Sequence, residues 1–309
     1  MADIVLGIAT SHTPQISVPW QEWPNMSQNE QVSSYVPPDL EEQLKPKTHE
    51  RRHAAVQAAI KTLGRVLRET EDLDAIVMYG DDQHEQFNDE NMPALAIYHG
   101  DDFSLKRQRS LRGRWLELEE ANWEKTHEEY PNASGLAKYL VSSLTDQEFE
   151  ITRCNALREG IGIGHAFSFL YRRLWPECNV PIVPIMMNTY YPPNQPTPRR
   201  AFRLGQAVRN ALQQWDGGKR VAVIASGGLS HIVIEEKVDE QVLDGLRRQD
   251  PELLWTLPRE KLRGGTSEIL NWVALAGTLW PKEMTLVDYI PGYRSRPTTG
   301  CAMGFAYWR

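Results

Sequence analysis

Apolar and amphipathic stretches alternate along this chain. Short, nearly unbroken apolar runs of the kind that form buried strands occupy residues 4–9, 75–80, 94–98, 181–187 and 221–226. Between them, at 48–69 and 198–215, apolar residues recur every three or four positions, which predicts helices with one buried face. This alternation is typical of an α/β fold. We therefore expect a central mixed, largely parallel sheet flanked by helices, with the active site at the carboxyl ends of its strands.

The remaining segments complete a single predicted domain. Residues 105–145 are charged and helical in pattern, 149–153 is a short strand candidate, and helices dominate from 227 to about 280 before two closing strands at 286–289 and 304–308. The stretch 14–46 is rich in Pro, Gln and Trp and is too long for an ordinary connection, so it is expected to be a lid or insertion over a site. With no repeat and no break in composition, residues 1–309 are predicted to form one catalytic domain.

Composition limits the class of partner and the compartment. The net charge of −7 and a pI near 5.7 provide no basic surface for nucleic acid or acidic lipid. Three widely spaced cysteines without a CxxC pair argue against a disulfide framework and fit a reducing compartment. No apolar run approaches the roughly 20 residues of a spanning helix, and none at the start resembles a signal peptide. A cytoplasmic protein without nucleic-acid or membrane partners is expected.

Four histidines stand where an open α/β sheet places its chemistry. His12, His84 and His231 each follow closely on an apolar strand run, and His165 follows the Gly-rich stretch 160–164. Loops beyond the carboxyl ends of parallel strands converge, so these imidazoles are expected to meet in one crevice. Several imidazoles in one crevice indicate a metal site.

A carboxylate is needed to complete such a site. Two histidines and one carboxylate on one face of a metal leave positions open for substrate and oxygen, as in non-haem Fe(II) oxygenases. Only one candidate acid, Glu268, is followed by a largely apolar helical stretch able to bury it. The acids that lie near a turn or helix start are Asp81, Asp82, Glu85, Glu235, Glu236 and Glu268.

Each of these residues also has a purely structural interpretation. His12 and His84 could cap helices or satisfy loop carbonyls at the strand ends. His231 could be a turn residue after two glycines, and Glu268 an acid favoured by the dipole at a helix start.

A separate motif points to another class of enzyme. His49-Glu50-Arg51-Arg52-His53 spells HExxH, in which two imidazoles one helical turn apart bind zinc and the glutamate activates water. The two arginines inside the motif favour the solvated start of a surface helix. A zinc metallopeptidase using His49 and His53 nevertheless stays as the alternative function.

Four motifs in the same order resemble the class III extradiol ring-cleavage dioxygenases, the family that includes the catalytic chain of protocatechuate 4,5-dioxygenase. The resemblance covers nearly the whole chain. The motifs are GIATSHTP at 7–14, YGDDQH at 79–84, GGLSH at 227–231 and TSEILNW at 266–272.

The resemblance implies roles for individual residues. His12, His84 and Glu268 would bind Fe(II), and His231 would act as acid and base. His165, where the match is looser, would line the substrate pocket and assist catalysis. A catecholic substrate and O2 are the implied partners. A neutral imidazole can accept a proton from a catechol hydroxyl and later return it.

The sequence gives less information on the substrate and on the oligomeric state. Segment 294–299, with Arg294, Arg296 and Thr299, corresponds to a region where relatives that take carboxylated catechols hold the acid group. The two arginines could grip a carboxylate, or could be exposed loop charges. Some relatives use a small second subunit to close the pocket; a homo-oligomer covered by the chain's own lid is the other arrangement. The superfamily also includes non-catalytic binding proteins, a further alternative.

Overall fold

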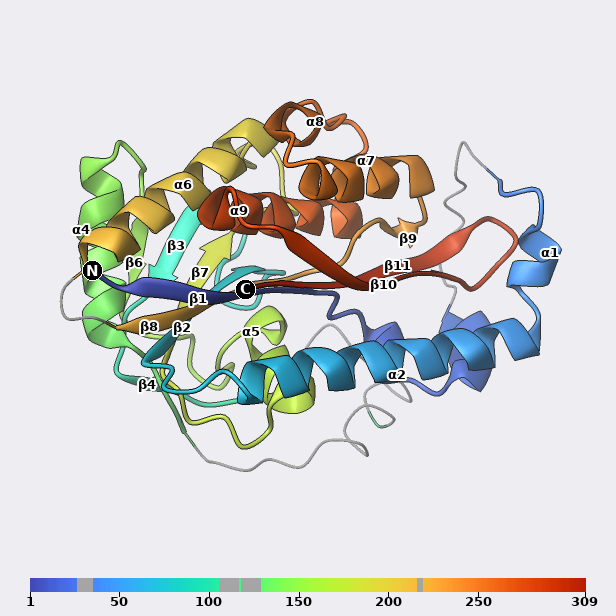
Figure 1. Cartoon of the computed structure of the whole chain (residues 1–309), viewed down its shortest axis with the longest axis horizontal. Coiled ribbons are helices and arrows are strands. Elements are labelled where there is room, and N and C mark those ends of the chain that lie inside the picture. Colours follow the sequence, from blue (N-terminus) through green and yellow to red (C-terminus); the bar gives the residue numbers. More distant parts are fainter. Residues whose placement is uncertain (27–35, 106–116, 118–128, 216–218) are drawn as a thin grey trace.

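A computed structural model describes residues 1–26, 36–105, 117, 129–215 and 219–309. One twisted sheet runs through the molecule with helices on both faces (Figure 1). Its strand order is β10-β11-β1-β8-β2-β7-β3-β6, with β9 beside β11. The strands are β1 (Asp3–Thr10), β2 (Ala75–Asp81), β3 (Leu95–Tyr98), β6 (Thr152–Cys154), β7 (Ile182–Met187), β8 (Arg220–Ser226), β9 (His231–Val233), β10 (Met284–Tyr293) and β11 (Thr299–Trp308).

The centre of the sheet is parallel and its flanks are mixed. Strands β1, β8, β2 and β7 pair in parallel, as do β3 and β6. Strand β3 is antiparallel to β7, and β11 is antiparallel to β1, β10 and β9. Every residue of β2 and β7 is buried, as expected for parallel strands covered on both faces. The predicted mixed, largely parallel α/β sheet is confirmed.

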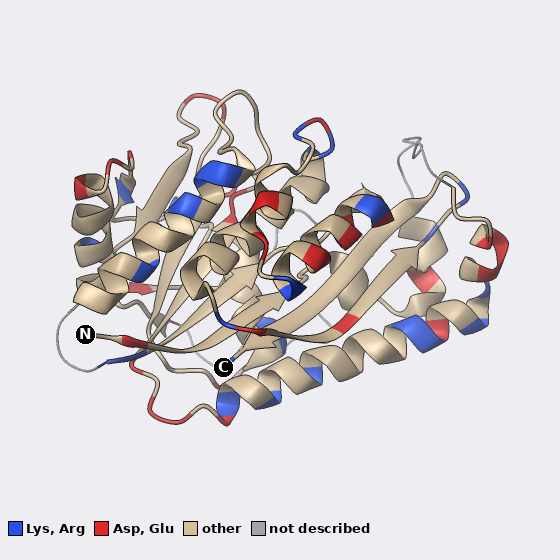
Figure 2. Ribbon diagram, turned by 45° about the horizontal axis from the view of Figure 1, so that its top comes forward, with Lys and Arg blue, Asp and Glu red and all other residues tan. Residues whose placement is uncertain are grey.

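Helices cover both faces of this sheet (Figure 1). Helices α2 and α5 lie on one face, and α4, α6, α7, α8 and α9 lie on the other. The larger helices are α2 (Pro46–Arg68), α4 (Ser134–Asp146), α6 (Pro198–Gln214), α7 (Glu236–Arg247) and α9 (Ile269–Leu279), and the shorter ones are α1 (Leu40–Gln43), α5 (His165–Phe169) and α8 (Pro251–Trp255). Positions of Lys and Arg and of Asp and Glu are interspersed along the outer helices (Figure 2).

Two apolar cores hold the layers together, one on each face. On one side, Leu63 of α2 packs in the same cluster as Ile8 of β1. On the other, α6 and α9 pack on the sheet and against each other so closely that a Cβ atom at Gly205 would lie 1.9 Å from the Ala274 carbonyl oxygen. A glycine is therefore needed where these two helices cross.

Two predicted segments differ in detail from the structure. The short strand expected at 149–153 lies at Thr152–Cys154 instead. The closing strands are longer than predicted because they form one antiparallel hairpin, β10–β11, whose pairing extends past the apolar residues. A further two-stranded sheet pairs β4 (Asp102–Phe103) with β5 (Tyr130–Pro131). The helical prediction over 105–145 is borne out in α4, while 106–116 and 118–128 lie outside the described residues.

The predicted lid is described only at its ends. Residues 27–35 lie outside the described part, and the flanking pieces form the short helices η1 (Pro14–Ile16), η2 (Trp20–Met26) and α1. Trp23 is fully buried against α2, where its ring centroid lies 5.5 Å from that of His49. In the described residues, no helix is both long enough and apolar enough to cross a membrane.

Candidate metal centre and active site

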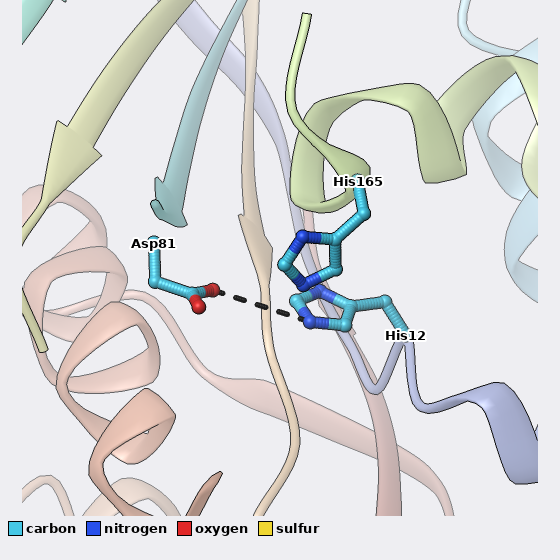
Figure 3. A group of neighbouring side chains, drawn as sticks. All are labelled: His12, Asp81 and His165. Atoms are coloured by element: carbon cyan, nitrogen blue, oxygen red, sulfur yellow. Dashed lines mark ion pairs between the residues drawn. The ribbon is translucent and has the colours of Figure 1, made fainter. Parts of the chain in front are cut away.

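Three buried side chains converge at the carboxyl edge of the sheet (Figure 3). His12 follows β1 by two residues, Asp81 ends β2, and His165 begins α5. One potential ligand atom from each lies within 4.8 Å of the other two. This meeting follows from the parallel pairing of β1, β8 and β2, which brings their carboxyl ends together.

Two buried polar atoms in this group make no hydrogen bond with the residues that the structure describes, although one of them lies 3.3 Å from Glu268 Oε2. They are His12 Nε2 and Asp81 Oδ1, which lie 4.0 Å apart. A buried polar atom without a partner costs free energy, so such an atom needs an explanation. Imidazole and carboxylate are ordinary ligands of divalent metals. The donor set and the separation fit an ion placed between the side chains.

A hydroxyl orients the His12 ring. Its Nδ1 lies 3.0 Å from Oγ of Ser226, the last residue of β8. With a proton on Nδ1 donated to that oxygen, Nε2 keeps the lone pair that a metal ligand needs. The second ring, His165, meets His12 edge to face at a centroid distance of 4.7 Å.

Glu85 holds His165 in place. Its Oε2 lies 2.8 Å from His165 Nδ1, and its two oxygens accept the His165 backbone N–H at 3.0 and 3.1 Å. Burial lowers the pKa of His165, but the carboxylates of Glu85, Asp81 and Glu268 outweigh it and raise that pKa to about 10. The region around His165 is therefore strongly negative in potential, which favours a cation, whether proton or metal.

Glu268 stands on the other side of His12. Its Oε2 lies 3.3 Å from His12 Nε2 and accepts the Gly228 N–H at 2.8 Å. Its Oε1 accepts a hydrogen bond from Gln83 Nε2 at 3.1 Å and lies 3.1 Å from His231 Nε2. Burial raises the pKa of Glu268, but His231 and His12 outweigh it and hold that pKa well below its usual range. The glutamate is a buried, ionised carboxylate.

His231 is placed to carry a proton beside this carboxylate. Its Nδ1 lies 2.8 Å from the Leu229 carbonyl oxygen, so Nδ1 bears a hydrogen and Nε2 faces Glu268. Burial lowers the pKa of His231, and Glu268 outweighs it, raising that pKa to about 10. The ring packs so tightly on Gly265 that a Cβ atom there would lie 2.1 Å from it. His231 also lines a cavity of about 390 Å³.

The structure does not place the His84 ring in the His12–Asp81–His165 group. That ring stacks on Tyr191 at a centroid distance of 3.8 Å, and Nε2 lies 3.2 Å from the exposed Asp89. Its neighbour Gln83 takes the inward position and donates to Asp81 at 3.0 Å as well as to Glu268. His84 has a positive φ of 59°, which turns the chain away from the strand just beyond Gln83.

The predicted carboxylate-binding segment is engaged elsewhere. Arg296 is exposed, and its Nε lies 3.0 Å from Glu41 Oε1. The Arg294 backbone N–H bonds to the Thr299 carbonyl oxygen and helps to close the β10–β11 hairpin. Thr299 is buried and pairs with Val233, two positions from the pair of Cys301 with His231, so only Thr299 lies on the strand that adjoins the site.

The HExxH histidines have structural roles. His49 Nε2 lies 3.0 Å from the Tyr293 carbonyl oxygen, and burial lowers the pKa of His49. His53 Nε2 lies 3.4 Å from Gln57 Nε2, and Glu50 is exposed. Within the described ranges, neither histidine belongs to a group of three or more potential ligands.

The sequence alone singled out His12, His165, His231 and Glu268 as site residues, and these lie close together in the structure. It listed Asp81 and Glu85 among several candidate acids but did not select them. It missed Gln83. The signal that was present is its place directly after two aspartates at the end of a buried strand. An amide is an uncommon metal ligand outside calcium sites, so the residue type drew no attention.

Fold and site together define an α/β protein with a buried histidine–carboxylate cluster at the carboxyl edge of its sheet. The chain belongs to the family described as the catalytic LigB subunit of aromatic ring-opening dioxygenase, whose model matches residues 31–304. The resemblance to extradiol ring-cleavage enzymes is thereby confirmed at the level of the family.

Two curated relatives match parts of the chain. A gallate dioxygenase of Pseudomonas putida is 32% identical over 159 residues, 47% of this chain and 45% of that protein. A 2,3-dihydroxyphenylpropionate/2,3-dihydroxicinnamic acid 1,2-dioxygenase of Cupriavidus pinatubonensis is 31% identical over 129 residues, 40% of this chain and 39% of that protein. The match therefore spans less than half the length of either relative.

Proposed function

We propose that this protein is an Fe(II)-dependent extradiol dioxygenase that opens the ring of a substituted catechol. The observation that carries this is the pair of buried atoms without hydrogen bonds, His12 Nε2 and Asp81 Oδ1, in a group completed by His165. Two imidazoles and one carboxylate are the donor set of non-haem Fe(II) oxygenases. Membership of the ring-opening family supports the same reaction.

The metal ligands we propose are His12, Asp81 and His165, with Glu268 adjacent. The family resemblance implies a different set, His12, His84 and Glu268. The two sets share His12 and are separated by Asp81 and His84, so they can be tested independently. Asp81→Asn is expected to lose bound iron, while His84→Ala keeps it; the reverse result would support the set that the resemblance implies.

The substrate class follows from the relatives' names. Gallate and dihydroxyphenylpropionate are both aromatic rings with adjacent hydroxyls and a carboxylate. We propose a carboxylated catechol and O2 as the substrates of this chain.

The protein residues supply binding, shielding and proton transfer. Bound Fe(II) would provide the route for electrons between the aromatic ring and O2. His231, whose raised pKa keeps a proton on the ring beside Glu268 and at the edge of a cavity, would donate that proton during ring opening and take one back from the hydroxyl of the next catechol. The burial of His12, Asp81 and Glu268 keeps bulk water from the reacting atoms.

The first test is anaerobic purification with metal analysis, followed by oxygen uptake with a panel of catechols. Wild-type protein is expected to hold one iron per chain and to consume oxygen, and His12→Ala is expected to lose both. His49→Ala serves as the matched control and should keep both. Zinc that is lost in His49→Ala, without oxygen uptake in the wild type, would overturn the proposal and favour the metallopeptidase. A chain that binds no metal would instead be a non-catalytic relative.

We propose two alternative assemblies for the functional protein. A homo-oligomer in which the chain covers its own site, or a complex with a small second subunit, would both enclose the cavity beside His231. Analytical ultracentrifugation of the purified protein, alone and after mixing with a lysate of the source organism, separates the two arrangements. A homo-oligomer forms without the lysate, whereas a second subunit changes the sedimentation only when the lysate is present.

A further inference from the structure

Two cavities meet beside the segment that leads to Glu268. The larger, about 760 Å³, is lined by Tyr190, Leu270 and Arg259 among others, and the smaller, about 390 Å³, contains His231. Both are bordered by Glu260, Arg263 and Gly264. The larger volume is within the range of small-molecule sites.

The smaller cavity adjoins the candidate site directly, and the larger lies beside it. The smaller includes His231, whose Nε2 lies 3.1 Å from Glu268. The larger borders the same segment, since Leu270, two residues after Glu268, and Tyr190 line it, and it shares Gly264 with the smaller cavity. The Tyr190 hydroxyl is also 3.9 Å from where a Cβ atom at Gly264 would lie. Arg263, next to Gly264, therefore stands between the two cavities and close to the reacting residues.

The arginines at this junction are free to bind an anion. Arg259 and Arg263 are exposed, and their guanidinium groups make no ion pair or hydrogen bond with any residue that the structure describes. Nearby, Lys261 Nζ is already paired with Glu235 at 2.7 Å, and Glu260 adds one negative charge. The segment shared by the two cavities, taken together with Glu235, therefore carries one net positive charge, in a chain whose net charge is −7.

We propose that Arg263, assisted by Arg259, forms a subsite that binds the carboxylate of the aromatic substrate and directs its hydroxylated ring towards His231. The proposal rests on the function proposed above and adds the residues that select the substrate. A guanidinium group matches a carboxylate with two parallel hydrogen bonds, and this geometry fixes orientation as well as affinity. Arg296 cannot serve in the same way while it is paired with Glu41.

The test compares substrates that differ only in charge. Iron-loaded wild type, Arg263→Gln and Arg259→Gln are assayed with 3,4-dihydroxybenzoate, 3-(2,3-dihydroxyphenyl)propionate and uncharged 4-methylcatechol. For the best carboxylated substrate, Arg263→Gln is expected to lower kcat/KM about tenfold, mainly through KM, because the group is exposed and partly screened. Values for 4-methylcatechol should not change. The matched control, Arg296→Gln, should behave as wild type with every substrate.

A binding measurement separates this subsite from the reaction. Ligand-observed NMR on the same proteins, as purified, compares 3-phenylpropionate with uncharged 3-phenylpropanol. The subsite predicts that wild type binds the anion more tightly and that Arg263→Gln removes the preference.

The outcomes are distinct. Unchanged kinetics in Arg263→Gln, or equal losses with charged and uncharged catechols, would overturn the subsite. If the wild type cleaves no catechol, the proposed function fails, and the subsite then stands only if Arg263→Gln abolishes the preference for the anion in the binding assay. No preference in the wild type would reject the subsite whatever the enzyme's activity.

Discussion

At the scale of single residues, the site depends on partners that orient each imidazole. Ser226 sets the His12 ring, the Leu229 carbonyl sets His231, and Glu85 sets His165. A metal-binding imidazole usually needs such a partner on its other nitrogen, because that hydrogen bond fixes both tautomer and direction. Glu85 is the strongest of the three, since it holds both the ring and the backbone of His165.

We expect Glu85→Gln to weaken metal binding by about 10- to 100-fold, the usual effect of removing such an orienting carboxylate. The amide keeps the shape but loses the charge that favours a donor on Nδ1. Competition titration with a chelating dye measures the affinity. Glu50→Gln, a change at an exposed glutamate, is the control, and equal affinities in the two variants would contradict the role given to Glu85.

At the scale of elements, one buried carboxylate joins a helix, a loop and a strand. Asp239 of α7 accepts hydrogen bonds from the Ser230 N–H at 2.7 Å, the Ser230 hydroxyl at 2.6 Å and the Tyr289 hydroxyl of β10 at 2.8 Å. These bonds hold the loop that carries His231 against the helix layer. Burial raises the pKa of Asp239 to about 7, although the bonds from Ser230 and Tyr289 lower it.

This raised pKa makes stability depend on pH. Between about pH 4, the usual pKa of an aspartate, and pH 7, the folded protein binds the Asp239 proton more tightly than the unfolded chain does. The stability therefore falls as pH rises through this window. Relative to Asp239→Asn, which cannot titrate, the free energy of unfolding of the wild type should fall by about 2 kcal/mol from pH 5 to pH 7. Urea denaturation at several pH values measures this difference, and parallel curves for the two proteins would refute it.

At the scale of the whole molecule, the centre joins parts of the chain that are far apart in sequence. His12 follows β1, Asp81 ends β2 and His165 begins α5, so an ion between them would link two strands of the sheet to the helix layer that contains α5. A ligand that binds only the folded state stabilises it in proportion to its affinity, by about 2.7 kcal/mol at 100 times its dissociation constant.

Anaerobic addition of Fe(II) to metal-free protein should therefore raise the melting temperature by several degrees, and a chelator should reverse the rise. Differential scanning calorimetry is the measurement. His12→Ala should show no such rise. His53→Ala changes a histidine that lies outside the metal centre, and it should respond as the wild type does. A rise of the same size in His12→Ala would mean that the ion binds elsewhere.

The order and type of the main elements were predictable because burial leaves a local pattern. The fully buried strands β2 and β7 are continuous apolar runs, and α2 and α6 repeat their apolar residues at helical spacing. The long hairpin β10–β11 was only partly predicted, since its outer residues are half exposed and owe their strand conformation to pairing rather than to a buried face.

The sequence by itself determined the fold class, the family and the presence of histidines and acids just beyond the strands, because strand ends and their polar residues are local features. Only the tertiary structure decided which of them meet. At the end of β2, it turns Asp81 and Gln83 towards Glu268 and His84 towards Tyr191, a choice made by backbone dihedral angles rather than by residue type. It likewise pairs Arg296 with Glu41, and it leaves Arg263 beside the site without a side-chain partner among the described residues. Partners of this kind depend on distances between elements, which no local spacing encodes.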